Sequence, residues 1–116
     1  DYYACAGEVK AELRERARPE LKKYLDSLDG YDTIYVGYPN WCGTMPMAMF
    51  TFLEHYDLSG KTICPFCTNE GSGMGYSERD LKQVCKGATV KAGLSIHGAE
   101  AAQSRDRVEA WVKKQA

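Results

Sequence analysis

The residues best suited to chemistry lie in two short loops rich in glycine and polar residues. The first loop, Pro39–Thr44, carries a large aromatic side chain, Trp41, and lies within the stretch GYPNWCGTMP. The second loop, Thr68–Gly75, reads TNEGSGMG, and its glycines allow backbone N–H groups to approach a flat ligand closely. Together the loops predict a clamp for a planar ligand, although the glycine spacing is not the GxGxxG pattern of dinucleotide sites.

Each loop is expected to join a strand to a helix. The first follows a β-branched and aromatic run at 33–36, and Thr44 is a candidate N-cap for the helix after it. The second follows an expected strand at 61–68, and Ser77 and Asp80 have the spacing of a capping box. Because ligands bind beyond the carboxyl ends of parallel strands, both loops are expected at one edge of a sheet.

The rest of the chain predicts an α/β fold. An amphipathic helix is expected at 4–17, a third strand near 89–96, and a last helix with Val108, Trp111 and Val112 facing inward. Alternating strands and helices with short connections specify a parallel sheet covered on both faces. The helix after the first loop has a stripe that we interpret as core packing: Met45, Met49, Phe52, Leu53 and Tyr56.

Composition narrows the class of protein. The 116 residues carry a net charge of -1 with both signs interleaved, which predicts a single domain at 1–116 without a basic face for nucleic acid or anionic lipid. No apolar run approaches the roughly 20 residues of a membrane span. An odd number of cysteines, five, disfavours a disulfide framework and suggests a reducing, cytoplasmic location.

The cysteines leave some alternatives open. Cys64 and Cys67 form a CxxC, which in a thiol oxidoreductase lies at a helix N-terminus. Here the motif falls in an expected strand, where residues three apart face opposite sides, so we interpret both as buried packing residues. No second ligand pair suggests zinc. Cys42 could place a thiol beside a bound ligand or could simply be a small side chain in a tight loop.

The ordered series of motifs resembles the flavodoxin-like family of FMN-binding proteins. The motifs are GYPNWCGTMP at 37–46, FLE at 52–54, DLSGKT at 57–62, PFCT at 65–68 and GSG at 71–73, and the resemblance covers residues 1–111. It implies a three-layer α/β/α fold in which Trp41 covers the flavin ring and the second loop contacts its pyrimidine edge. The implied cofactor-binding residues are Pro39, Asn40, Trp41, Cys42, Gly43, Thr44, Thr68, Asn69, Glu70, Gly71, Ser72 and Gly73. Glu70 could accept from the flavin N3–H or simply be a solvated loop residue. The resemblance implies no catalytic side chain and no metal.

The sequence departs from the family pattern at its start. The family begins with a strand and a Ser/Thr-rich loop that holds the FMN phosphate at a helix N-terminus, and the sequence shows neither. We therefore expect an N-terminally truncated fold with about three strands and weakened or lost FMN binding. Losing three charge-assisted hydrogen bonds of ~1.5–3 kcal/mol each lowers affinity by roughly three to six orders of magnitude or more. The strand at 33–36 would become an open edge, which favours a homodimer or pairing with another segment.

Three functions follow as expectations. The first is an electron-transfer protein or FMN-dependent oxidoreductase that holds FMN non-covalently and exchanges electrons with a redox partner protein or a small acceptor. The second is a truncated domain of the same fold that acts as an assembly or interaction module. The third is a thiol oxidoreductase using Cys64 and Cys67.

Overall fold

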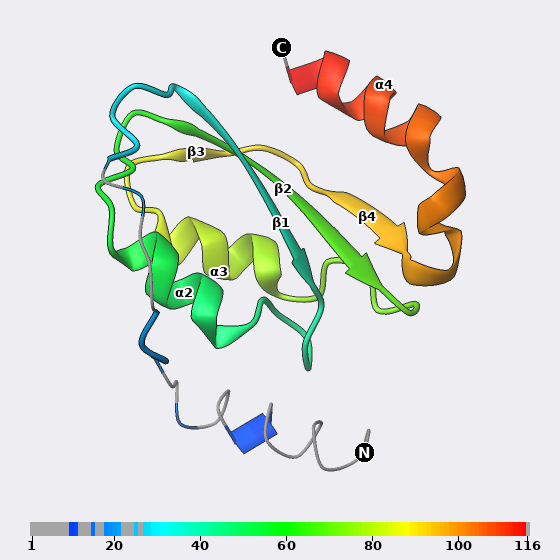
Figure 1. The fold of residues 1–116 in the computed structure, drawn as a ribbon, viewed down its shortest axis with the longest axis horizontal. Coiled ribbons are helices and arrows are strands. Elements are labelled where there is room, and N and C mark those ends of the chain that lie inside the picture. Colours follow the sequence, from blue (N-terminus) through cyan, green and yellow to red (C-terminus); the bar gives the residue numbers. More distant parts are fainter. Residues whose placement is uncertain (1–9, 12–14, 16–17, 22–24, 26, 116) are drawn as a thin grey trace.

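The computed structural model describes residues 10, 11, 15, 18–21, 25 and 27–115, so most of the helix expected at 4–17 lies outside the described residues. Figure 1 shows a sheet with helices packed on its faces. The elements, in order, are β1 (Thr33–Pro39), α2 (Met47–Glu54), β2 (Thr62–Asn69), α3 (Ser77–Val84), β3 (Thr89–Val90), β4 (Leu94–His97), a 3-10 helix (Gly98–Gln103) and α4 (Arg105–Gln115).

The sheet is parallel throughout, as the order of elements predicted. Central strand β2 pairs with β1 on one side and with β3 and β4 on the other. The β1–β2 register runs from Thr33 opposite Thr62 to Pro39 opposite Thr68, so both strands end beside each other. The first and second loops therefore leave the same edge of the sheet.

The third strand is interrupted, in contrast to the continuous strand expected near 89–96. β3 and β4 both pair with β2, but residues 91–93 between them carry no strand assignment. The N–H of Gly93 donates instead to the Glu78 carboxylate at 2.8 Å, and the Ala92 carbonyl accepts from the Trp111 indole at 3.3 Å. Side chains from α3 and α4 thus engage the backbone groups of this segment.

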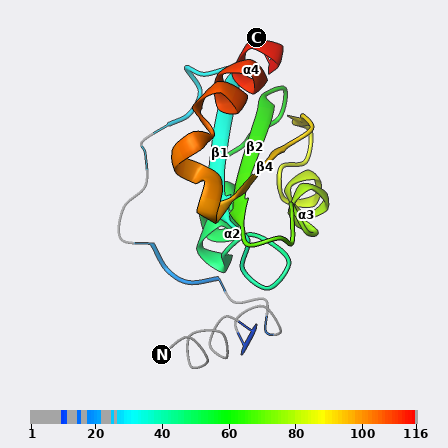
Figure 2. The same ribbon diagram turned by 90° about the vertical axis from the view of Figure 1, so that its right-hand side faces the viewer.

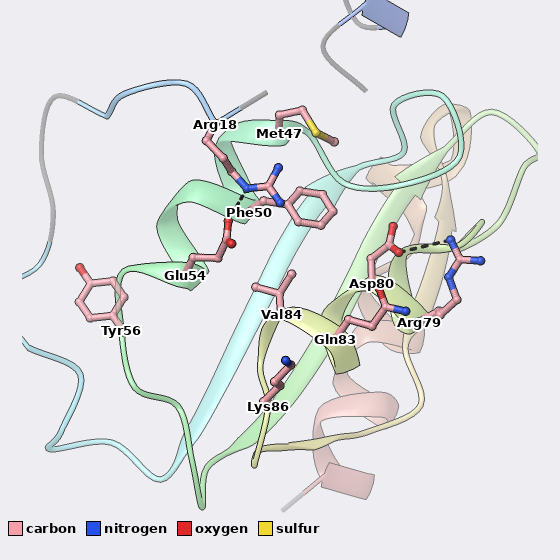
Figure 3. A pocket seen from close by; sticks show the side chains of 10 residues that line it. All are labelled: Arg18, Met47, Phe50, Glu54, Tyr56, Arg79, Asp80, Gln83, Val84 and Lys86. Carbon is pink, nitrogen blue, oxygen red and sulfur yellow. Dashed lines mark hydrogen bonds and ion pairs between the residues drawn. The ribbon is translucent and has the colours of Figure 1, made fainter. Parts of the chain in front are cut away.

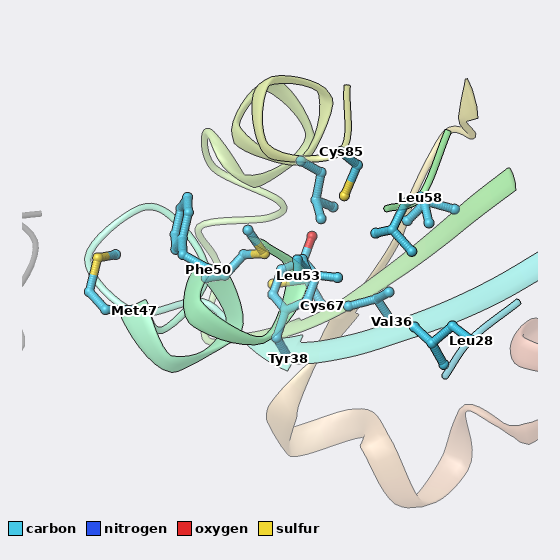
Figure 4. Packing of buried hydrophobic residues seen from close by; sticks show 12 residues of the cluster. Leu28, Val36, Tyr38, Met47, Phe50, Leu53, Leu58, Cys67 and Cys85 are labelled. Carbon is cyan, nitrogen blue, oxygen red and sulfur yellow. The ribbon is translucent and has the colours of Figure 1, made fainter. Parts of the chain in front are cut away.

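Helices cover both faces of the sheet (Figure 2). On one face, α2 and α3 enclose a core, much of which is drawn in Figure 4. Its buried members are Leu28, Val36, Tyr38, Met45, Met47, Phe50, Leu53, Leu58, Ile63, Cys67, Leu81 and Cys85. The expected stripe belongs to this layer, since Met45 and Leu53 are buried and Met49, Phe52 and Tyr56 pack against the core.

The opposite face is covered by α4 through Trp111. Its indole ring meets Tyr35 edge to face at a centroid distance of 5.6 Å and Phe66 at 6.1 Å. Gly37 makes room for this layer, because a Cβ there would overlap the Phe66 ring. Trp111 faces inward as expected, whereas Val112 is exposed. Among the described residues, no helix is long and apolar enough to cross a membrane.

Candidate functional site

The two loops are joined by the side chain of Asn40. Its Nδ2 donates to the carbonyl oxygen of Gly73 in the second loop at 3.0 Å, and its Oδ1 accepts from the N–H of Gly43 at 2.9 Å. Its backbone N–H also donates to the Thr68 carbonyl at 2.8 Å, which continues the ladder beyond Pro39. A single amide thus satisfies groups in both loops and fixes one against the other.

The tip of the first loop is a tight two-residue turn. Trp41 and Thr44 exchange backbone hydrogen bonds of 2.8 and 3.3 Å. Between them, Cys42 and Gly43 both have positive φ, 53° and 97°, as a type I′ turn requires. This geometry is unusual for a cysteine. The Trp41 side chain remains 44% exposed, so an aromatic surface is available at the tip of the loop.

Further contacts hold the turn against the start of α3. The N–H of Tyr76 donates to the Gly43 carbonyl at 2.6 Å, and the buried Thr44 donates its hydroxyl to Asp80 at 2.5 Å. Gly75 has a φ of 57°, and a Cβ there would collide with the Gly43 carbonyl oxygen. Only glycine therefore fits the close approach of the second loop to the turn.

Both predicted caps are wrong, because tertiary contacts use the same side chains. Thr44 does not cap α2, whose N-cap is Pro46, and instead binds Asp80. Ser77 does not form a capping box with Asp80, since α3 has Tyr76 at its N-cap without a side-chain bond. The Ser77 hydroxyl donates to the Met74 carbonyl at 2.6 Å and accepts from the buried Tyr38 hydroxyl at 2.8 Å.

The side chain of Asn69 holds the second loop in place through hydrogen bonds. This residue is buried, its Oδ1 accepts from the Gly71 N–H at 2.9 Å, and its Nδ2 donates to the Ser95 hydroxyl at 2.8 Å. These bonds make Asn69 a structural support of the second loop. Glu70 projects outward with its side chain 77% exposed, and one of its oxygens lies 3.6 Å from Nε2 of His97.

Residues 72 and 73 of the second loop have backbone N–H donors without a partner among the described residues and open space around them. Gly71 and Gly73 have φ values of 120° and 66°, and a Cβ at either would meet nothing within 4 Å. Among the described residues, the N–H groups of Ser72 and Gly73 have no hydrogen-bond acceptor. Such donors suit the ring carbonyl oxygens of a planar heterocycle. Neither loop contains Lys or Arg, so their side chains offer no positive charge for a phosphate.

The CxxC cysteines are packing residues, as interpreted from the sequence. Cys64 and Cys67 are fully buried, and Cys67 belongs to the core under α2 and α3. Burial raises the pKa of Cys64 and raises that of Cys67 to about 11, which opposes formation of a reactive thiolate. Cys42 is exposed in the first loop. In the part of the chain that the structure describes, no three His, Cys, Asp or Glu side chains group as metal ligands.

A groove of about 830 Å³ lies between α2 and α3 (Figure 3). Arg18 forms an ion pair with Glu54 across one wall, and its guanidinium lies 4.9 Å from the Phe50 ring centre. None of the predicted cofactor-binding residues lines this groove. Its lining residues are Arg18, Met47, Phe50, Glu54, Tyr56, Arg79, Asp80, Gln83, Val84 and Lys86.

Comparison with known proteins assigns the family. The family model described as Flavodoxin matches residues 5–115. The chain belongs to the flavodoxin family. The parallel α/β fold and the predicted resemblance are thereby confirmed. A search among curated proteins found no match to this flavodoxin-family chain.

Solved structures support the same family. A candidate flavoprotein from Bacteroides uniformis is 35% identical with a TM-score of 0.82, covering 97% of this chain and 70% of its own. Another candidate, from Bacteroides eggerthii, is 28% identical with a TM-score of 0.73, with coverage of 90% and 67%. A flavoprotein from Lactobacillus acidophilus in complex with FMN is 20% identical with a TM-score of 0.63, with coverage of 89% and 69%, and shares the fold.

Proposed function

We propose that this flavodoxin-family chain binds FMN non-covalently and transfers electrons between the flavin and a redox partner protein or small acceptor. The observation that supports the proposal most strongly is that the Asn40 side chain joins the two loops. One loop carries the exposed Trp41, and the other has N–H groups, at Ser72 and Gly73, without an acceptor among the described residues. The Lactobacillus relative with the same fold was solved with FMN, which adds support.

The residues present fit the flavin ring. The exposed Trp41 side chain can stack on the ring. Among the described residues, the N–H groups of Ser72 and Gly73 have no acceptor, and they belong to a loop in which a Cβ on Gly71 or Gly73 would meet nothing within 4 Å. Exposed Glu70 offers an acceptor for a ring N–H. When bound, FMN supplies the one- and two-electron chemistry. The chain itself binds and orients the ring and excludes water from one of its faces, so it needs no acid, base or nucleophile.

The ring contacts alone predict modest affinity. Stacking on an aromatic contributes roughly 0.5–1.5 kcal/mol beyond buried area, and the two loops add no cationic side chain for the phosphate. We therefore expect Trp41→Ala to weaken FMN binding by at least roughly threefold to tenfold, since the apolar area buried against the ring is lost as well. Trp41→Phe preserves a stacking ring and serves as the conservative control.

The test is an equilibrium titration of FMN with the purified chain, followed by the absorbance and fluorescence of the flavin without any separation step. Spectral changes that saturate, and that need more of the Trp41→Ala chain than of the Trp41→Phe chain, support the proposal. A flavin spectrum that stays unchanged with the chain in large excess refutes it for this chain. A potentiometric titration of the bound flavin then tests for reversible electron uptake.

Among the strands that the structure describes, β1 lies at the edge of the sheet with a neighbour on one side only, which favours a second candidate, an assembly or interaction module. At the two ends of β1, the Asp32 carbonyl accepts from Thr62 and the Asn40 N–H donates to Thr68, so these even-numbered residues face β2. Because backbone groups alternate along a strand, the N–H and C=O groups of Thr33, Tyr35 and Gly37 point away from β2. Such an edge can pair with another strand. Association of the chain without any flavin uptake would favour this module over the electron carrier.

A further inference from the structure

The outer edge of β1 has unused hydrogen-bonding groups at regular intervals. Among the strands that the structure describes, β1 pairs only with β2, which has β3 and β4 on its other side. The N–H and C=O groups of Thr33, Tyr35 and Gly37 point away from β2. All three residues are exposed, whereas Val36 and Tyr38 are buried. The outward groups are therefore accessible to another strand.

The sequence of β1 lacks the devices that usually protect an edge strand from pairing. The strand reads TIYVGYP and contains no charged residue, although charges on an edge strand are what commonly discourages pairing. Its single proline, Pro39, lies at the carboxyl end and leaves every N–H from Thr33 to Tyr38 in place. Nothing in the strand itself opposes the addition of a neighbour.

The spacing of the outward groups fits a second copy of the same strand running antiparallel. Residues of a hydrogen-bonded antiparallel pair exchange both of their N–H to C=O bonds. With Tyr35 opposite Tyr35 of the second copy, Thr33 of each copy lies opposite Gly37 of the other, and every outward donor has an acceptor. A shift by two residues places Thr33 opposite Pro39, which has no N–H. The opposite shift places Gly37 opposite Tyr31, whose N–H is already bonded within its own turn.

The same register brings apolar side chains together on both faces of the joined sheet. Tyr35 is 42% exposed, and its ring centre lies 5.6 Å from that of Trp111 on the α4 face. Cα atoms in a hydrogen-bonded antiparallel pair are about 5.5 Å apart, so the two Tyr35 side chains would be cross-strand neighbours. On the other face, the half-buried Ile34 lies opposite Val36 of the second copy, which extends the core across the junction.

We propose that two copies of this chain form a two-fold symmetric dimer in which their β1 strands pair antiparallel, centred on Tyr35. The interface is isologous, because Thr33 and Gly37 exchange places between the copies. The sheet of one copy continues into that of the other, and the α2–α3 layers of both lie on the same side. This inference names the partner of the edge strand on which the second candidate function depends, and it does not rest on FMN binding.

The test measures mass and backbone protection as the concentration of the chain is raised. Light scattering from about 1 µM to about 1 mM should show the mass rising from that of one chain to that of two. Hydrogen exchange by NMR then identifies the strand. Protection of the Thr33, Tyr35 and Gly37 amides should rise with concentration, whereas the Val36 and Tyr38 regions of β1, paired with β2, should stay protected throughout.

Two variants of β1 and one control locate the interface. Tyr35→Lys places two ammonium groups opposite each other and should raise the dimer dissociation constant at least about tenfold. Because Tyr35→Lys also removes the contact with Trp111, Thr33→Pro is the second variant; it keeps that contact, removes one outward donor and should also weaken the dimer. The matched control, Thr89→Lys, puts a lysine at an exposed residue of β3, across the sheet from β1, and should leave the constant unchanged.

Several results would overturn the dimer. They are a chain that stays monomeric up to about 1 mM, a dissociation constant that neither β1 variant changes, or a Tyr35 amide whose protection does not depend on concentration. A loss of the dimer in Thr89→Lys as large as in Tyr35→Lys would also overturn it. The FMN titration separates the two proposals. Dimerisation without FMN binding leaves this inference standing, and FMN binding by a chain that stays monomeric overturns this inference alone.

Discussion

Replacing Asn40 by alanine should separate the two loops without disturbing the sheet. The substitution removes the 3.0 Å bond to the Gly73 carbonyl and the 2.9 Å bond from the Gly43 N–H. At ~0.5–1.5 kcal/mol of net stability each, the free energy of unfolding should fall by about 1–3 kcal/mol. The turn bonds between Trp41 and Thr44 involve only backbone atoms and should persist.

Two measurements check this prediction. Urea denaturation gives the change in the free energy of unfolding, and hydrogen exchange by NMR should show faster exchange of the Gly43 amide with little change at the Trp41 amide. Asn40→Asp retains the acceptor for Gly43 but places a carboxylate oxygen against the Gly73 carbonyl, so it should also be destabilised.

The control for this experiment is Ser72→Ala, because Ser72 is exposed in the second loop and its hydroxyl makes no hydrogen bond among the described residues. Its unfolding free energy should stay within about 0.5 kcal/mol of wild type. An Asn40→Ala chain as stable as Ser72→Ala, with unchanged exchange at the Gly43 amide, would refute the reasoning that this side chain joins the loops.

Three other perturbations have defined outcomes. Gly75→Ala should destabilise the chain by about 1–2 kcal/mol from its positive φ alone and weaken FMN binding, because its Cβ would push the Gly43 carbonyl away; denaturation and FMN titration that match wild type would contradict this. Burial raises the pKa of Cys67 and Cys85 from 9.0 to about 11, so the unfolded chain loses these thiol protons at a lower pH than the folded chain does. The free energy of unfolding should therefore be unaffected by these groups below pH 9 and should fall as the pH rises from 9 to 11, by at most roughly 3 kcal/mol per thiol. Urea curves should show a loss that Cys85→Ala reduces and Cys42→Ala does not, and a flat profile would contradict this. We also expect the open edge of β1 to pair with a strand of a second copy or another polypeptide, and light scattering of a stable monomer at low concentration would count against that.

The sequence was sufficient for the fold and for the position of the loops. Strand and helix periods alternate along the chain, and in a parallel sheet this order places the ends of β1 and β2 at one edge. The strands extend slightly further than expected, since β1 continues from Val36 to Pro39 and β2 from Thr68 to Asn69. Pro39 is tolerated because it lies at the end of an edge strand.

The tertiary contacts of the two loops could not be predicted from local sequence. Thr44 and Asp80 each have a common local role at a helix start, yet they are 36 positions apart and bind each other once the fold brings them together. The glycine spacing of the second loop hinted at a close approach at Gly75, but only the structure identifies the Gly43 carbonyl as its neighbour. No local sequence pattern pointed to Tyr76, because its exposure and its cation–π contact with Arg79 depend on tertiary structure.

An NMR titration of the chain with FMN is the sharpest test of whether the two loops form one flavin-binding unit. We expect the amide signals of Cys42, Ser72 and Gly73 to shift together with a common affinity, and Asn40→Ala to weaken all three equally. Shifts confined to one loop, shifts centred on the groove between α2 and α3, or no shifts at saturating FMN would contradict it.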